Sequence, residues 1–137
     1  AAISACEKGG RPDTALDLLD EMKGRGLEPN VITYSAAISA CEKGGRPDRA
    51  VDLLAEMRRQ GIEPDVITYS AVISACEKGG RTGTALDLLD EMKGRGLEPN
   101  VITYNAAISA CEKGGRPDTA LDLLAGMKER GLEPDVI

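Results

Sequence analysis

The residues of this chain that are best suited to specific recognition are small polar side chains that recur every 35 residues. One set directly follows a tyrosine and comprises Ser35, Ser70 and Asn105. A second set directly follows a Glu-Pro pair and comprises Asn30, Asp65, Asn100 and Asp135. Hydroxyl, amide and carboxylate groups supply the hydrogen-bond donors and acceptors that could read the edges of nucleic-acid bases.

One lysine per repeat keeps the same spacing, at Lys8, Lys43, Lys78 and Lys113. A regular row of cations is what a protein needs to follow a phosphate backbone along its length. A structural explanation is also open, in which Ser, Asn and Asp cap helices or stabilise turns and Lys balances a helix dipole. Spacing alone does not separate the two explanations.

Several kinds of catalytic and metal centre are excluded by the residue types present. The chain has no His, so Ser-His-Asp and Cys-His centres and imidazole zinc sites are ruled out. Its four cysteines, at positions 6, 41, 76 and 111, form no CxxC pair. Because packed helices lie roughly 8–10 Å apart, equivalent cysteines are too distant for disulfides and should be reduced, buried packing residues. No cofactor, metal or catalytic role is therefore expected.

The overall composition narrows the remaining possibilities. Of 137 residues 42% are apolar, which is enough for a core, but three Tyr are the only aromatics. A base-stacking platform is therefore excluded, and no apolar run approaches the ~20 residues of a membrane span. With 17 basic and 23 acidic residues the formal net charge is −6. Clusters such as Asp17, Asp20 and Glu21 are expected to form a solvated face.

The elements that position these residues follow from an internal repeat. The string ISACEKGG begins at Ile3, Ile38, Ile73 and Ile108, each 35 residues after the last. The chain reads as one array, with a partial unit at 1–30, full units at 31–65, 66–100 and 101–135, and the start of another at 136–137. Such a repeat predicts a linear stack of small units instead of one globular core.

Each unit reads as two helices. In the first full unit, Thr33 is expected to cap a helix that runs from Tyr34 to about Lys43 and stops at a Gly-Gly turn. Pro47 suits the first turn of a second helix, which runs to about Gln60. Two helices joined by a tight turn form an antiparallel hairpin. The predicted fold is all-α, an α-solenoid of eight helices in stacked hairpins that form a right-handed superhelix.

Helical spacing assigns the faces of these helices. The apolar face of the first helix carries Tyr34, Ala37, Ile38 and Cys41, and that of the second carries Ala50, Leu53, Leu54 and Met57. An acidic face of the second helix carries Asp48, Asp52 and Glu56. The unit at 66–100 has Thr82-Gly83 in place of Pro-Asp, which should weaken the start of its second helix.

The unit resembles the pentatricopeptide repeat. The resemblance rests on VITYSAAISACEKGGR, AxDLLxEM and GxEPD at a period of 35, and it covers the whole chain. The tetratricopeptide repeat has a W-x₂-L-G-x₂-Y signature that is absent here. Pentatricopeptide repeats read single-stranded RNA at one base per repeat. The resemblance therefore implies sequence-selective RNA binding without catalysis.

The resemblance also implies roles for single residues. The residue after each Tyr and the last residue of the same unit jointly choose the base: Ser35 with Asp65 for guanine, Ser70 with Asn100 for adenine, and Asn105 with Asp135 for uracil. Asn30 retains half of such a pair. The aliphatic residues that clamp each base are Ile32, Ile67, Ile102 and Ile137. The phosphate contacts are Lys8, Lys43, Lys78 and Lys113.

Taken together, these implied roles predict that the three full units read 5′-G-A-U-3′. The resemblance also implies that the chain is a non-catalytic piece of a longer array and that it acts in a mitochondrion or plastid. The alternative is a protein–protein interaction scaffold, which the acidic charge favours. The two ends of the stack are expected to leave apolar residues partly uncovered and so to support self-association. These residues are Ile3 and Cys6 at one end and Leu121, Leu124 and Met127 at the other. Neither a membrane nor a small-molecule substrate is implied.

Overall fold

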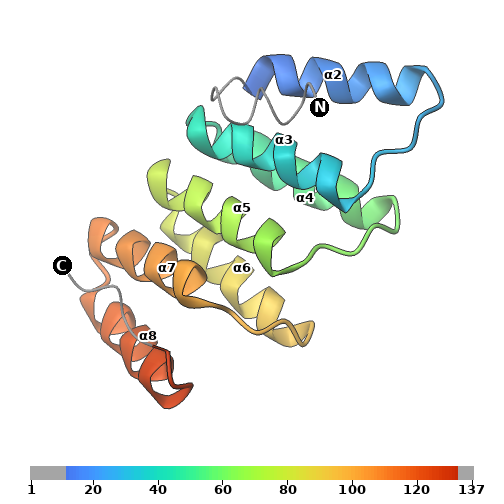
Figure 1. Ribbon diagram of the computed structural model, residues 1–137. Coiled ribbons are helices and arrows are strands. Elements are labelled where there is room, and N and C mark those ends of the chain that lie inside the picture. Colours follow the sequence, from blue (N-terminus) through green and yellow to red (C-terminus); the bar gives the residue numbers. More distant parts are fainter. Residues whose placement is uncertain (1–11, 133–137) are drawn as a thin grey trace.

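The computed structural model describes residues 12–132, which form seven helices and no strand. The helices are α2 (Pro12–Gly24), α3 (Val31–Lys43), α4 (Pro47–Arg59), α5 (Val66–Lys78), α6 (Thr82–Gly94), α7 (Val101–Lys113) and α8 (Pro117–Glu129). They lie in antiparallel pairs, α3 with α4, α5 with α6 and α7 with α8, stacked one on the next (Figure 1). This is the predicted α-solenoid; the first of its expected helices lies outside the described residues.

Local sequence signals set most of the helix boundaries. The first helices of the hairpins stop before a Gly-Gly pair, and the second glycine of one pair, Gly80, has a φ of +73°. That left-handed backbone suits glycine because it has no Cβ. Pro47 and Pro117 occupy the first turns of α4 and α8, as predicted. The α6 helix lacks this proline, yet it is 13 residues long, like α4 and α8.

The first helices begin earlier than the sequence-based expectation. Thr33 is not the cap, because α3 begins at Val31 and its N-cap is Asn30. The helices α5 and α7 are likewise capped by Asp65 and Asn100. Two suitable capping residues lie three positions apart in each unit, and Asp and Asn are stronger caps than Thr. The last residue of one unit therefore starts the first helix of the next.

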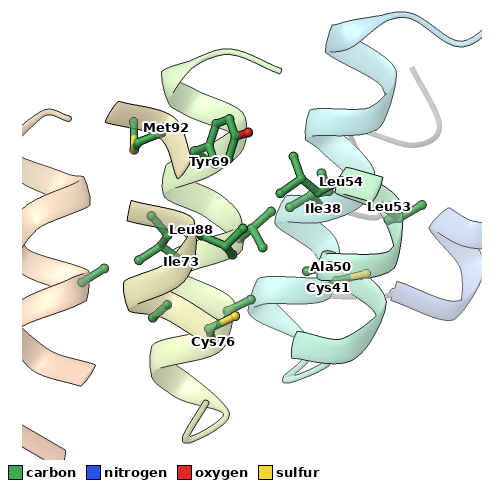
Figure 2. Close-up of a cluster of buried hydrophobic side chains, with 14 of the residues drawn as sticks. Ile38, Cys41, Ala50, Leu53, Leu54, Tyr69, Ile73, Cys76, Leu88 and Met92 are labelled. Carbon is green, nitrogen blue, oxygen red and sulfur yellow. The ribbon is translucent and has the colours of Figure 1, made fainter. Parts of the chain in front are cut away.

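The hydrophobic core runs continuously through the stacked hairpins. Figure 2 shows side chains of one hairpin, among them Ile38 and Leu54, beside Ile73 and Leu88 of the next. The described cysteines, Cys41, Cys76 and Cys111, are fully buried and form no disulfide, which confirms their predicted packing role. Burial raises the pKa of the Cys76 thiol to about 11. Cys6 lies outside the described residues.

The helices form two layers that pack differently. The backbones of the first helices α3, α5 and α7 pack directly against one another, whereas those of the second helices pack only against first helices. Side-chain ion pairs such as Lys23–Glu56 and Arg58–Glu91 connect successive second helices. At the glycine pairs a first helix closely approaches the second helix of the preceding hairpin, since a Cβ on Gly79 at the end of α5 would clash with the ring of Pro47 at the start of α4. In the second layer a hollow of about 490 Å³ separates α2 from α4. The first helices therefore form the tightly packed layer of the array.

The exposed end of the stack partly matches the expectation from sequence. Leu121 is 64% exposed and Leu124 is half-buried. Met127 is fully buried, so its expected exposure was wrong. It lies seven residues from Ala120, also buried, on the face of α8 that packs against α7. Ile3 and Cys6 lie outside the described residues. Between residues 12 and 132 no helix has the length and hydropathy to cross a bilayer.

Candidate nucleic-acid interface

The described base-selecting candidates at the ends of units are all helix caps. Oδ1 of Asn30, Asp65 and Asn100 accepts a hydrogen bond from the backbone N–H of the threonine three residues on, at 3.0, 2.9 and 2.9 Å. The hydroxyl of the same threonine donates a second bond to Oδ1. Thr68 and Thr103 also accept from the backbone N–H of their cap residue. These reciprocal bonds hold the Asp65 and Asn100 side chains in one orientation.

A threonine of the next unit links the two candidates of each unit. Ser35 Oγ lies 2.9 Å from Thr68 Oγ1, and Ser70 Oγ lies 2.6 Å from Thr103 Oγ1. Because the proton of each threonine is already donated to the cap residue, the serine donates to the threonine oxygen. Ser35–Thr68–Asp65 and Ser70–Thr103–Asn100 are therefore equivalent hydrogen-bonded chains.

These two hydrogen-bonded groups of residues present different atoms to a ligand. With Oδ1 engaged in the cap, Asp65 presents Oδ2, which only accepts hydrogen bonds, whereas Asn100 presents its Nδ2 amide, which donates. The backbone N–H of Thr103 can only donate, and this fixes which terminal atom of Asn100 is the oxygen. Adjacent units thus differ by the exchange of an acceptor for a donor at one atom.

Exposed isoleucines stand beside these polar groups. Ile32, Ile67 and Ile102 are 72%, 67% and 63% exposed, although large aliphatic side chains are usually buried. Ile32 and Ile67, from adjacent units, line a hollow of about 270 Å³ together with Ser35 and Asp65. The hollow has apolar walls and a polar edge, which suits a flat, hydrogen-bonding base.

The remaining candidates are only partly placed. Asn105 is half-buried on α7, but its proposed partner Asp135 lies outside the described residues. Ile137 and Lys8 also lie outside them. The structure therefore brings together two complete pairs of base-selecting candidates.

The candidate phosphate contacts take part in ion pairs. Lys78 pairs with Glu42 of the preceding first helix, and Lys113 pairs with Glu77 in the same way. The lysine side chains are 52% and 61% exposed, whereas the two glutamates are mostly covered. The ammonium groups remain open to solvent on one side. Lys43 is exposed at the end of α3.

A second polar network, which the sequence analysis missed, joins successive hairpins. Tyr34 Oη donates to Glu56 Oε2 at 2.6 Å, and Glu56 also pairs with Lys23 of the preceding hairpin. In the next hairpin Tyr69 donates to Glu91, which pairs with Arg58. The available signal was that each of these tyrosines precedes its glutamate by 22 residues. Glu56, expected on a solvated acidic face, is instead half-buried in this network.

The network changes the protonation of its members. Burial would raise the pKa of Glu56, but hydrogen bonds from Lys23 and Tyr34 outweigh it and lower that pKa below its ordinary value. Burial and the hydrogen bond to Glu91 raise the pKa of Tyr69 to about 12. Burial, followed by the bond to Glu56, also raises the pKa of Tyr34. Each described network therefore holds an ionised carboxylate against a neutral phenol.

The last hairpin lacks the glutamate of this network. Gly126 occupies the equivalent position, beside Tyr104. The Tyr104 hydroxyl is buried and has no hydrogen-bond partner among the described residues. Lys93, the equivalent of Lys23 and Arg58, lies with its Nζ 5.5 Å from the centre of the Tyr104 ring.

Comparisons of the sequence and of the structure with known proteins point to the same family. The sequence profile described as pentatricopeptide repeat domain matches residues 1–46, 17–81, 52–116 and 87–137. No curated protein sequence gave a significant match. The chain is similar to the solved pentatricopeptide repeat protein PPR10 in complex with an 18-nt psaJ RNA element, with a TM-score of 0.85 and 37% identity. That match covers 97% of this chain and 20% of PPR10.

Two further structures extend the comparison. A crystal structure of PPR10 from maize is equally similar, with a TM-score of 0.85 and 37% identity over 97% of this chain and 19% of that one. The repeat domain of Arabidopsis thaliana protein-only RNase P 1, in complex with tRNA, has a TM-score of 0.85 at 23% identity. That match covers 97% of this chain and 70% of that chain, and at this identity it shows a shared fold.

Proposed function

Since the chain belongs to the pentatricopeptide repeat family, we propose that it binds single-stranded RNA and selects one base per repeat. The observation that carries this proposal is the hollow between Ile32 and Ile67, with Ser35 and Asp65 at its edge. PPR10, at 37% identity, was solved in complex with an RNA element. The chain spans about a fifth of PPR10, so we propose that it is part of a longer array. The organellar location that the resemblance implies belongs to the same proposal.

Base choice follows from the atom that each cap leaves available. Asp65 Oδ2 would accept from the N1–H of guanine, and Asn100 Nδ2 would donate to N1 of adenine. Ser35 and Ser70 are alike in the two units and make the same bond to a threonine. The choice between guanine and adenine therefore depends on the acceptor or donor at the cap.

The other proposed contacts complete a binding path. Asn105 with Asp135 would select uracil, because a carboxylate accepts from N3–H and the longer Asn fills the space that a pyrimidine leaves. The family reads RNA with its amino-terminal unit toward the 5′ end, which gives 5′-G-A-U-3′. The exposed isoleucines would separate successive bases, and Lys43, Lys78 and Lys113 would contact phosphates. No catalytic step is assigned to this chain, which contains no His.

The proposal is tested by Asp65→Asn in a longer array of these units. Each matched base contributes about 1–3 kcal/mol, and association costs several kcal/mol, so three units alone should bind at best with micromolar Kd. In the longer array, Asp65→Asn should move the preference at one base from guanine to adenine, by about 5- to 150-fold. Binding to RNAs that vary only at that position measures the shift.

Two further variants make this test specific. The converse variant, Asn100→Asp, should move the preference at the next base from adenine to guanine. Glu63→Gln removes the same charge two residues away, at a side chain that is 87% exposed, and should leave base preference unchanged. An Asp65→Asn protein with unaltered preference would refute base reading at this site.

The alternative function is a scaffold that binds other proteins. It is favoured by the exposed aspartates of the second helices, which include Asp17, Asp20, Asp52, Asp87 and Asp90. A scaffold would tolerate exchanges between Asp and Asn at the caps without any change in RNA preference, because both residues cap helices well. The Asp65→Asn experiment therefore separates the two functions.

A further inference from the structure

The hairpin network is complete in two of the described units and incomplete in the third. In both complete copies, a glutamate of the second helix accepts from a buried tyrosine hydroxyl and pairs with a cation from the preceding hairpin. In the third copy Tyr104 and Lys93 are present, but Gly126 brings no carboxylate. Both groups that contact the carboxylate in the complete copies are therefore retained.

The hydroxyl of Tyr104 faces the position of the missing side chain. Tyr104 is 1% exposed, and its hydroxyl has no hydrogen-bond partner among the residues described. A Cβ built on Gly126 would lie 3.9 Å from that hydroxyl, with nothing else within 4 Å. A buried hydroxyl without a partner is costly, so this corner favours a ligand that accepts a hydrogen bond from it.

The charge at this corner favours an anion. Lys93 Nζ lies 5.5 Å from the Tyr104 ring centre, as Lys23 Nζ lies 5.8 Å from that of Tyr34. A second cation acts on one complete copy: burial would raise the pKa of Glu91, but Arg58 and Tyr69, with a further contribution from the Arg95 charge, lower it. The equivalent of Arg95 in the third copy, Arg130, is present and pairs with exposed Glu98. The equivalent carboxylates of Glu56 and Glu91 are 26% and 33% exposed at the side chain, so solvent reaches this location.

We propose that Tyr104, Lys93 and Gly126 form a binding site for a small aliphatic carboxylate. The glutamate side chain beyond Cα has the atoms of propionate, which makes propionate the ligand that best replaces it. The Tyr104 hydroxyl donates to the carboxylate, Lys93 supplies the opposite charge, and the ethyl group lies over Gly126. This site lies between α6, α7 and α8, and it does not depend on the proposed RNA binding.

The site is tested by unfolding and by NMR of the full chain. Compared with chloride at equal ionic strength, propionate at ten times its Kd should raise Tm by about 3–5 °C. The chain has three Tyr, so with ¹³C-labelled tyrosine the folded protein should show a saturable shift of Tyr104 while Tyr34 and Tyr69 stay in place. Propionamide, which has a similar shape and no charge, should give neither effect.

Matched variants distinguish the site from general salt effects. Gly126→Glu should raise Tm without any ligand and abolish the response to propionate. Gly126→Ala adds helix propensity alone, so it should raise Tm less than Gly126→Glu. Tyr104→Phe should lose the propionate response while remaining folded, because it removes only the hydroxyl without a partner. An equal response to chloride and propionate, or a response that persists in Gly126→Glu, would overturn the proposal.

Discussion

At the scale of single residues, the tyrosines of this chain are more than core fillers. Tyr34 and Tyr69 are fully buried, and each donates its hydroxyl to a glutamate that a neighbouring hairpin also contacts. One phenol thus holds together its own hairpin and, through the carboxylate, the preceding one. In an array without a common core, such contacts between neighbours carry the stability.

The shifted pKa of Tyr69 predicts a measurable titration. Its pKa is raised to about 12 from an ordinary value of 10.0. At pH 11, while the helices remain folded, about a tenth of Tyr69 should be ionised, against about nine tenths of a free tyrosine. Because the folded state holds the proton more tightly, this contribution to stability is complete below pH 10 and is lost as pH rises through 12.

NMR of ¹³C-labelled tyrosine can follow the Tyr69 titration directly. In Glu91→Gln the pKa of Tyr69 should fall but stay above 10.0, because burial is the larger cause of the shift. Glu98→Gln, which changes an exposed carboxylate in the same region, should have no effect. A Tyr69 that ionises like free tyrosine in the folded chain would contradict the network.

Sequence reasoning identified some of these residues and missed others for a physical reason. Ser35 and Asp65 could be named because the repeat and the family resemblance fix their positions. The Thr68 bridge between them could not, since it depends on how far one first helix slides along the next. The hydrogen bond from Tyr34 to Glu56, which lie 22 residues apart in the sequence, depends similarly on how α3 packs against α4. One-dimensional spacing records which residues recur, but not which of them meet.

At the scale of elements, the start of α6 shows how neighbours compensate for a weak local signal. Without Pro and Asp in its first turn, α6 still begins at Thr82 and has its full length. Thr82 Oγ1 donates to the carbonyl oxygen of Ala110 at 3.0 Å, which ties this start to the end of α7. The predicted weakness is one of stability and does not shorten the helix.

Restoring the acidic residue at this start should stabilise the chain. In α4, Asp48 pairs with Arg81 of the next hairpin at 3.0 Å. The equivalent residues are Gly83 and Arg116, and Arg116 lies 4.0 Å from a Cβ built on Gly83. Gly83→Asp should raise the free energy of unfolding by about 0.5–1.5 kcal/mol, through helix propensity, the helix dipole and this ion pair. Urea denaturation measures the change.

A second variant separates the contributions to this gain. Gly83→Ala gains helix propensity alone, so its stabilisation should not depend on salt. The part contributed by Asp should shrink in high salt, because exposed charges are screened. A Gly83→Asp protein no more stable than wild type at low salt would show that the α6 start is not weak.

The element boundaries were the most predictable part of the fold. The Gly-Gly pairs, Pro47 and the period of 35 are local signals, and the structure follows them. The error at Thr33 also had a local cause, the choice between two capping residues. The first glycine of each pair was interpreted only as part of a turn, because the close approach of Gly79 to Pro47, or of Gly114 to Thr82, in the preceding unit is not visible along the chain.

At the scale of the whole molecule, charge is divided between the two layers. The second helices expose aspartates, whereas the first helices end in lysines paired with glutamates across units. A net charge of −6 lowers general affinity for nucleic acid. In the proposed function, RNA phosphates would compete with Glu42 and Glu77 for Lys78 and Lys113. The paired lysines restrain the affinity that a bare row of cations would give.

Release of these lysines should strengthen RNA binding. In a longer array, the double variant Glu42→Gln and Glu77→Gln should bind RNA more tightly at low salt. The slope of log K against log salt should steepen by up to about 0.7 for each lysine newly engaged with a phosphate. Binding titrations across a series of salt concentrations measure both effects.

A control with the same change in net charge locates the effect. The double variant Asp52→Asn and Asp87→Asn removes two exposed carboxylates from the second helices, away from the lysines. It should change affinity far less than the glutamate variant. Equal gains from both variants would mean that only the overall field of the protein matters.

The threonine bridge defines the piece of this protein that can be exchanged. The sequence repeat divides after Asp65, yet Asp65 caps α5, and Thr68 joins it to Ser35. A graft cut at the repeat boundary would separate Asp65 from α5, the helix that it caps. A cassette that runs from Ser35 through Thr68 contains both proposed base-selecting residues and the threonine that links them. If these residues select the base as proposed, recombination within the first helices should preserve base preference, whereas recombination between repeats should disturb it.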